Sequence, residues 1–191
     1  ESTSKLLLFS DNGRFYTIGC DTLPKGRGFG EPINLFIDLP TEHTIVSVLK
    51  SDVEQLLLVS NKGYGLRVQT SNVIAQTKSG KQILNLKSDE RAQICVPVET
   101  DMIASIGKNR KLLIFPVSEV PLINRGRGVI LQRFKEGELA DLTLFDSKTG
   151  LTWKTNGNRI RHLTDYEFWR GKRGAAGKLP PNGFPRPARF T

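Results

Sequence analysis

The sequence lacks any long hydrophobic run. Its longest apolar stretches, such as Leu6–Phe9 and Leu56–Val59, have four residues, whereas a membrane-spanning helix needs about 20. The first residues, Glu1–Lys5, are polar and no long apolar segment follows them, so we expect the cut end of a longer protein rather than a secretory signal. These absences predict a cytoplasmic chain that has no membrane partner.

Cysteine and histidine are also scarce. The 191 residues include two cysteines, Cys20 and Cys95, and two histidines, with no Cys-x-x-Cys pair. Both cysteines stand beside strand-like apolar residues, so we interpret them as small buried side chains in a reducing compartment. Neither a zinc site nor a nucleophilic triad can be assembled from these residues. The sequence therefore predicts no catalytic residue, metal site or cofactor in this chain.

Acidic residues are few at one end of the chain. Lys and Arg total 28 against 19 Asp and Glu, a net charge of +9, and residues 151–191 hold nine basic but only two acidic side chains. A field of one sign attracts polyanions and speeds their encounter. The charge therefore favours a nucleic-acid partner, with a basic tail that only aids solubility as the alternative.

The most informative feature that is present is an internal repeat. Turn-forming residues that end in Gly13, Gly63 and Gly157 each stand between two strand-like runs, an arrangement typical of tight hairpins. The spacing places a fourth turn at Arg110, where the glycine is missing. The residues four and six positions before each turn position, and three and five positions after it, make a set of sixteen. Fifteen of them are apolar or aromatic, and His162 is the exception. This two-residue period predicts half-buried strands on both sides of each turn.

Further apolar stretches fill each repeat, so a period of 47–50 residues carries about four strands. Repeats of that size with four short strands are typical of propeller-like blades arranged around a centre. We therefore predict an all-β, propeller-like single domain over residues 1–191. Its four repeats are expected at residues 6–53, 56–101, 103–148 and 151–191.

A loop of glycine and basic residues follows each hairpin at a similar distance. The four loops begin 12, 15, 15 and 13 residues after the turn positions, so we expect them on the same edge of successive blades. Glycine lets the backbone approach a partner closely, and Arg and Lys donate charge-assisted hydrogen bonds to phosphate oxygens. Such a rim would hold double-stranded DNA by its backbone without reading its bases. The candidate DNA-binding residues are Lys25, Arg27, Lys78, Lys81, Arg125, Arg127, Arg170, Lys172, Arg173 and Lys178.

The last residues differ from the rest of the chain. Lys178–Thr191 is rich in proline and has no strand pattern. Proline removes a backbone donor and restricts the backbone, so this segment is not expected to build a blade. We expect it to pack along the surface or to stay mobile.

Several segments carry a resemblance to a known family. Leu23–Pro32, Ser60–Gly65, Leu113–Ser118 and Asn124–Gly128 resemble the C-terminal domain of the A subunit of bacterial topoisomerase IV, a type IIA topoisomerase related to DNA gyrase. The resemblance spans most of the chain in the same order and spacing. It implies a β-pinwheel, a propeller-like disc whose blades exchange a strand with their neighbours and which binds and bends DNA on a basic outer rim.

The resemblance further implies a non-catalytic part of an ATP-dependent enzyme. Catalysis would belong to the N-terminal breakage-reunion part of the same subunit, so Tyr16, Tyr64 and Tyr166 are not expected to act as nucleophiles. ATP and Mg²⁺ would be needed by the whole enzyme, together with its ATPase B subunit. The domain itself would engage the transported duplex and tune decatenation and supercoil relaxation.

Two alternatives stay open. The gyrase homologue carries a related disc that wraps DNA and is marked by a Gln-Arg-Arg-Gly-Gly-Lys-Gly box, which no segment here matches. This absence favours topoisomerase IV over gyrase. The other alternative is a propeller-type protein-interaction scaffold whose basic rim meets an acidic protein partner.

Overall fold

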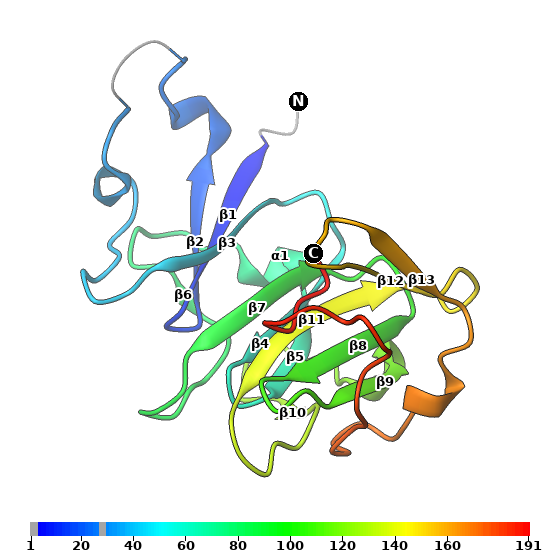
Figure 1. The fold of residues 1–191 in the computed structure, drawn as a ribbon. Helices are drawn as coiled ribbons and strands as arrows, with labels where there is room; N and C mark the ends of the chain where they lie inside the picture. The colour runs from blue at the N-terminus through cyan, green and yellow to red at the C-terminus, as the bar shows by residue number, and fades with distance from the viewer. Residues whose placement is uncertain (1–3, 27–29) are drawn as a thin grey trace.

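Figure 1 shows the chain in a computed structural model, which describes residues 4–26 and 30–191. The described residues form 13 strands, one short helix, α1 (Thr70–Val73), and four single turns of 3-10 helix at Cys20–Thr22, Ile33–Leu35, Val117–Glu119 and Glu167–Trp169. The predicted all-β class is therefore confirmed. The strands are β1 (Lys5–Ser10), β2 (Arg14–Gly19), β3 (Ile45–Lys50), β4 (Gln55–Ser60), β5 (Tyr64–Gln69), β6 (Lys81–Gln82), β7 (Ala92–Pro97), β8 (Met102–Gly107), β9 (Leu112–Pro116), β10 (Val129–Ile130), β11 (Leu139–Phe145), β12 (Leu151–Lys154) and β13 (Ile160–Leu163).

The strands of the described residues form four sheets, which we call blades 1 to 4. Blade 1 has the order β3-β1-β2-β6, blade 2 β10-β5-β4-β7, blade 3 β11-β8-β9, and blade 4 contains β12 and β13. Four-stranded blades were predicted throughout, but the regular ladder has this number only in blades 1 and 2. In blade 3 the place of the fourth strand, beside β9, is taken by isolated bridges from Arg170 and Lys178.

Neighbouring blades exchange strands. The short strand β6 belongs to the second repeat but pairs with β2 of blade 1, and β10 belongs to the third repeat but pairs with β5 of blade 2. In blade 3, the N–H of Leu112 donates to the carbonyl of Lys178, a residue of the fourth repeat, at 2.7 Å. Each of blades 1 to 3 is thus completed by the repeat that follows it, and the predicted β-pinwheel is confirmed.

The hairpin turns explain why the repeat is visible in the sequence. Gly13 and Gly63 have φ angles of 80° and 83°, in the left-handed region that glycine adopts without steric cost. Arg110 has a φ of 61°, so the third hairpin keeps the same turn although it lacks the glycine. The period predicted across position 110 is therefore correct.

The predicted register of the fourth repeat is wrong by one residue. The left-handed residue is Asn158, with a φ of 59°, and its N–H donates to the carbonyl of Thr155 at 3.0 Å, as in the other three hairpins. Asparagine tolerates this conformation better than other side chains, so the turn does not depend on Gly157. As a result, Trp153 takes the place of Leu8 in blade 1 rather than that of Phe9.

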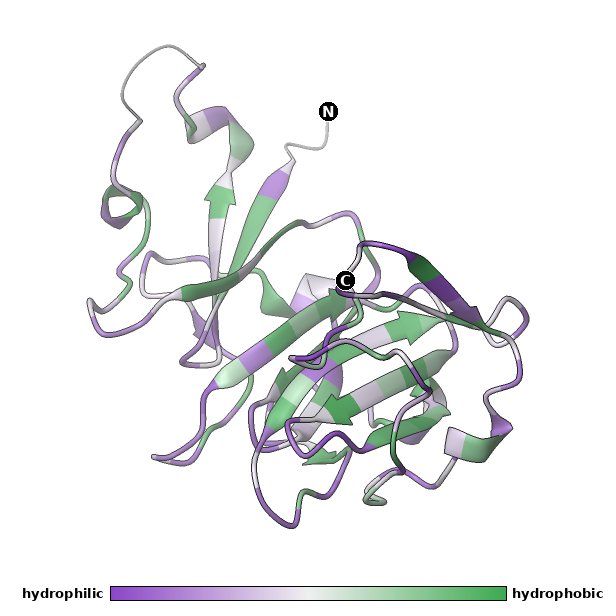
Figure 2. Ribbon diagram, viewed as in Figure 1, coloured by the Kyte–Doolittle hydropathy of each residue, from purple (hydrophilic) through white to green (hydrophobic). Residues whose placement is uncertain are grey.

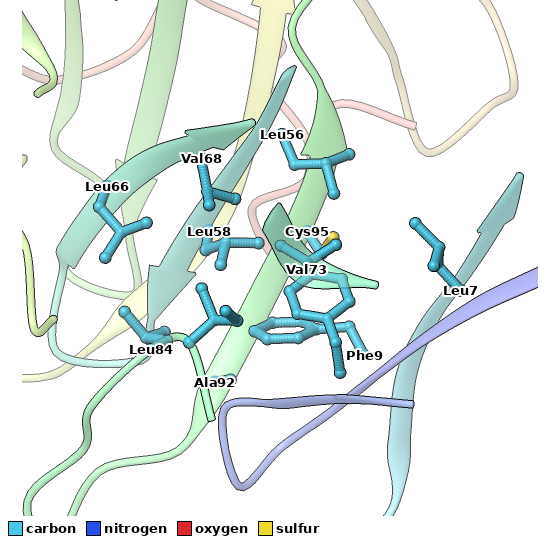
Figure 3. Close-up of a cluster of buried hydrophobic side chains, with 12 residues drawn as sticks. Leu7, Phe9, Leu56, Leu58, Leu66, Val68, Val73, Leu84, Ala92 and Cys95 are labelled. Carbon is cyan, nitrogen blue, oxygen red and sulfur yellow. The ribbon is translucent and has the colours of Figure 1, made fainter. Parts of the chain in front are cut away.

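The hydrophobic core lies between successive blades. Figure 3 shows the cluster between blades 1 and 2, in which Leu7 and Phe9 lie beside Leu58 and Cys95. Two further clusters join blade 2 to blade 3 and blade 3 to blade 4. Because each inner blade contacts two neighbours, its strands are buried on both faces, and Leu56–Ser60 of β4 are all buried. Among the described strands that flank the turns, β12 of blade 4 shows the predicted half-buried alternation most clearly.

The C-terminal segment is part of this core. Phe184 and Phe190 are 5% and 3% exposed and pack against Trp153, with ring centroids 5.5 Å apart for Trp153 and Phe184. The carbonyl of Phe190 accepts a hydrogen bond from the N–H of Lys154 in β12 at 2.9 Å. Of the two expectations for this segment, packing along the surface is therefore confirmed and mobility is wrong, because aromatic anchors hold the segment although a strand pattern is missing.

One face of blade 4 is exposed. Thr152, Lys154, Ile160 and His162 are opposite one another on β12 and β13, and all four are exposed. Figure 2 shows β13 as hydrophilic over most of its length. Within the described part of the chain, no strand pairs with the outer side of β13. His162 thus lies at an exposed edge, which explains why this position of the repeat can be polar.

Candidate nucleic-acid interface

Three of the four glycine-basic loops connect successive blades by an equivalent backbone hydrogen bond. The N–H of Asp38 donates to the carbonyl of Lys78 at 2.9 Å, and the N–H of Asn85 to that of Gly126 at 2.8 Å. The third such bond runs from Arg133 to Ala175 at 3.1 Å. These loops, residues 78–81, 125–128 and 170–178, are called the rim loops below. Their equivalent joints place them at the same edge of successive blades, as their common phase in the sequence predicts.

Glycine in the rim loops serves the packing of the loops onto the preceding blade. Gly80 has a φ of 73°, and a Cβ atom there would lie 2.6 Å from the carbonyl oxygen of Phe15. Gly128 has a φ of 78°, and a Cβ atom there would overlap the carbonyl of Gly65. The sequence interpretation assigned these glycines to close contact with a partner. The structure shows that the close contact is internal.

The first loop has no such contacts. Gly26 and Gly30 have φ angles of 56° and 74°, and a Cβ atom at either would meet nothing within 4 Å. Lys25 is exposed. Arg27, the other candidate residue of this loop, lies outside the described residues.

Six of the predicted binding residues are exposed cations on the rim loops. Three of them also donate within the protein: Lys78 donates to the carbonyl of Leu35 at 2.9 Å, Lys81 to the carbonyl and side-chain oxygens of Asn72, and Arg170 to the Glu167 carboxylate at 3.4 Å. An ammonium group has three donors and a guanidinium group five, so each side chain keeps at least one donor for a phosphate. The six residues are Lys78, Lys81, Arg125, Arg170, Lys172 and Lys178.

Arg127 and Arg173 are bound within the protein instead. Arg127 pairs with the Glu90 carboxylate, whose side chain is 1% exposed, and its guanidinium lies 3.6 Å from the ring centroid of Tyr64. The hydrogen bond with Glu90 raises the pKa of Arg127. Arg173 donates to the carbonyl of Ile130 at 2.7 Å. Both arginines therefore attach their loops to the preceding repeat.

Arg14 has the same role in the first joint, and the sequence analysis missed it. Its guanidinium donates to the carbonyl of Ser79 at 2.8 and 3.0 Å and to that of Gly80 at 3.1 Å. Its position directly after a turn glycine gave no signal, because its acceptors are 65 and 66 residues away in the sequence. One arginine thus fixes each of the three rim loops.

The folded chain presents a row of three fixed loops, on successive blades, that carry exposed positive charge. Phosphates of a duplex are the ligands that lysine and arginine side chains in such an arrangement can bind by charge and hydrogen bonding. Among residues 4–26 and 30–191, there is no helix long and apolar enough to cross a membrane.

Comparison with known proteins defines the class. The family described as the DNA gyrase C-terminal domain, beta-propeller, matches residues 4–52, 54–95 and 101–140. The chain belongs to this family.

The individual relatives are named DNA topoisomerase 4 rather than DNA gyrase. The chain is 43% identical to the A subunit of DNA topoisomerase 4 from Rickettsia conorii and 42% identical to that from Caulobacter vibrioides, over the whole of this chain. It spans 26% and 25% of those two proteins, about a quarter of their length. The solved E. coli ParC C-terminal domain is 30% identical with a TM-score of 0.82, over 95% of this chain and 78% of that structure. The resemblance noted in the sequence is confirmed.

Proposed function

We propose that this chain is the non-catalytic, DNA-binding and DNA-bending domain of a topoisomerase IV A subunit. The observation that carries the proposal is the row of exposed cations on the three rim loops, held at one edge of successive blades. Cations fixed in this way can replace the counterions of several phosphates at once, which is the main source of affinity for duplex DNA.

The curvature of the disc supports bending. A duplex that contacts all the rim loops has to follow the edge of the disc, and bending 20–30 base pairs costs roughly 1–6 kcal/mol. Each additional phosphate contact offsets part of that cost. Because the loops offer no fixed array of donors for base edges, binding is expected to depend little on DNA sequence.

The role in the whole enzyme follows from the relatives. The domain would engage the transported duplex and so tune decatenation and supercoil relaxation. Strand cleavage would belong to the breakage-reunion part of the same polypeptide, and ATP and Mg²⁺ would serve the whole cytoplasmic enzyme with its ATPase B subunit. The support for this proposal is that the relatives named DNA topoisomerase 4 match this chain over its full length.

The test compares two pairs of charge substitutions. Arg125→Gln/Lys172→Gln removes two exposed cations of the rim loops, and Lys50→Gln/Lys148→Gln removes two exposed cations elsewhere. Fluorescence anisotropy with a labelled 20-base-pair duplex should show binding at least 10-fold weaker for the rim pair, and less than 2-fold weaker for the control pair. Equal effects of the two pairs would contradict the proposal.

A further inference from the structure

A second concentration of positive charge surrounds Glu138, away from the rim-loop residues. The ammonium groups of Lys62 and Lys108 lie 3.7 and 3.3 Å from its carboxylate, and the guanidinium of Arg91 lies 3.5 Å from it. The three cations are 37–59% exposed, whereas Glu138 is 23% exposed. One carboxylate balances only one of these charges, so two remain at the surface.

Two surface grooves continue this charge toward the C-terminal segment. Lys108 also lines a groove of about 480 Å³ together with Arg110 and Arg186. Arg186 in turn lines a groove of about 640 Å³ together with Arg159 and Arg161. Among residues 4–26 and 30–191, no acidic side chain lines either groove.

The shared residues Lys108 and Arg186 make the three features continuous. We call this surface the turn-side track, because most of it is formed by the hairpin turns of blades 2, 3 and 4 and the C-terminal segment, together with Arg91 before β7 and Arg161 on β13. Within the described part of the chain it brings seven cations together with one carboxylate, and it includes none of the residues predicted to bind DNA. Its cationic residues are Lys62, Arg91, Lys108, Arg110, Arg159, Arg161 and Arg186.

A purely structural role explains only part of this charge. Charged residues on an edge strand prevent pairing with other chains, which accounts for Arg161 on the open side of β13. Arg110 has a structural role too, since it donates to the carbonyls of Pro185 at 2.8 Å and Phe184 at 3.3 Å. Neither role applies to Lys62, Lys108 or Arg186, which are not on β13 and extend the same surface.

We propose that the turn-side track is a second binding site for the phosphate backbone of duplex DNA. The proposal rests on the proposed function, because both sites take the same ligand, but it assigns that ligand to a different set of residues. Guanidinium groups match phosphate oxygens with paired hydrogen bonds, and three arginines line the larger groove. Bases of a single strand would need exposed aromatic rings to stack on, and the one ring that lines the groove, Phe184, is 5% exposed.

The experiment removes two groove arginines, Arg159 and Arg161, whose side chains make no hydrogen bond or ion pair within the described residues. Arg159→Gln/Arg161→Gln is compared with Arg159→Lys/Arg161→Lys, which keeps the charge, and with Lys50→Gln/Lys148→Gln. Anisotropy with a labelled 20-base-pair duplex should show binding roughly 5–20-fold weaker for the glutamine pair, with a salt slope smaller by about 2. The lysine pair should restore most of the affinity, and melting temperatures should stay unchanged.

The outcomes separate this inference from the proposed function. If the rim pair Arg125→Gln/Lys172→Gln weakens binding and the groove pair behaves like the control, the track does not bind DNA and the rim assignment stands. If only the groove pair weakens binding, the track is the DNA site and the rim assignment is wrong. If both weaken binding, both sites are supported. If neither does, both proposals are wrong.

Discussion

Single residues determine how accurately each hairpin turn can be located from the sequence. Gly13 and Gly63 mark two turns because glycine is the usual residue in the left-handed region. Arg110 and Asn158 adopt the same conformation with side chains, at φ angles of 61° and 59°. Arg110 was placed correctly from the period, whereas the nearby Gly157 drew the fourth turn one residue too early. A glycine is therefore a good sign of such a turn but not a necessary one.

Residues that pair over long distances could not be assigned from the sequence. Arg127 has the composition and position of a phosphate ligand, and only the fold brings the carboxylate of Glu90 to it from 37 residues away. The turn-side cations were missed for the same reason. They come from three turns, two strands or strand ends and the C-terminal segment, and they meet only in the folded chain.

The pair formed by Arg127 and Glu90 makes a prediction about stability. Arg127→Gln should lower the free energy of unfolding by about 2–3 kcal/mol, because it leaves the buried carboxylate unpaired. The partly exposed guanidinium keeps this loss below the roughly 3–5 kcal/mol typical of fully buried pairs. Urea denaturation of Arg127→Gln, Glu90→Gln and the double variant measures the coupling. A coupling below about 0.5 kcal/mol would show that the pair contributes little.

At the scale of elements, the strands of blades 1 to 3 were predictable and the ends of the array were less so. Alternation and turn residues located the hairpins of these blades, since each hairpin repeats the same local chemistry. Burial on both faces was not predicted, because it depends on the neighbouring blade rather than on the strand. The C-terminal segment was misjudged because its anchors, Phe184 and Phe190, have no periodic spacing.

Strand β9 offers a test of the third repeat. Leu113 is 2% exposed and packs in the cluster between blades 2 and 3. Leu113→Ala should lower the free energy of unfolding by about 2–4 kcal/mol and leave the DNA affinity of the folded protein nearly unchanged. Thermal melting and anisotropy measure the two effects. An unchanged melting temperature would mean that the side chain is not in the core.

The C-terminal segment offers a second stability test. Phe190→Ala should lower the free energy of unfolding by about 3–4 kcal/mol, because it removes a buried ring from the cluster that joins blades 3 and 4. Leu179→Ala in the same segment is the matched control, since Leu179 is 64% exposed. Similar melting temperatures for the two variants would contradict the core position of the segment.

At the scale of the whole molecule, the strand exchange joins function to fold. Blades 1 to 3 are each completed by the following repeat. The exchanged residues lie at the end of the rim loop in blade 1, directly after it in blade 2 and within it in blade 3. Building the core therefore also builds the row of loops. A rim loop therefore cannot move along the edge of the disc without disturbing the sheet to which it belongs.

The salt dependence of DNA binding tests the central claim most directly. If the domain neutralises roughly 5–8 phosphates, the logarithm of its association constant should fall against the logarithm of salt concentration with a slope of about −4 to −7. Anisotropy titrations of the unmodified chain with a 20-base-pair duplex, at a series of potassium chloride concentrations, give this slope. A slope between about −1 and 0, or no binding at low salt, would contradict a cationic surface that holds duplex DNA by its phosphates.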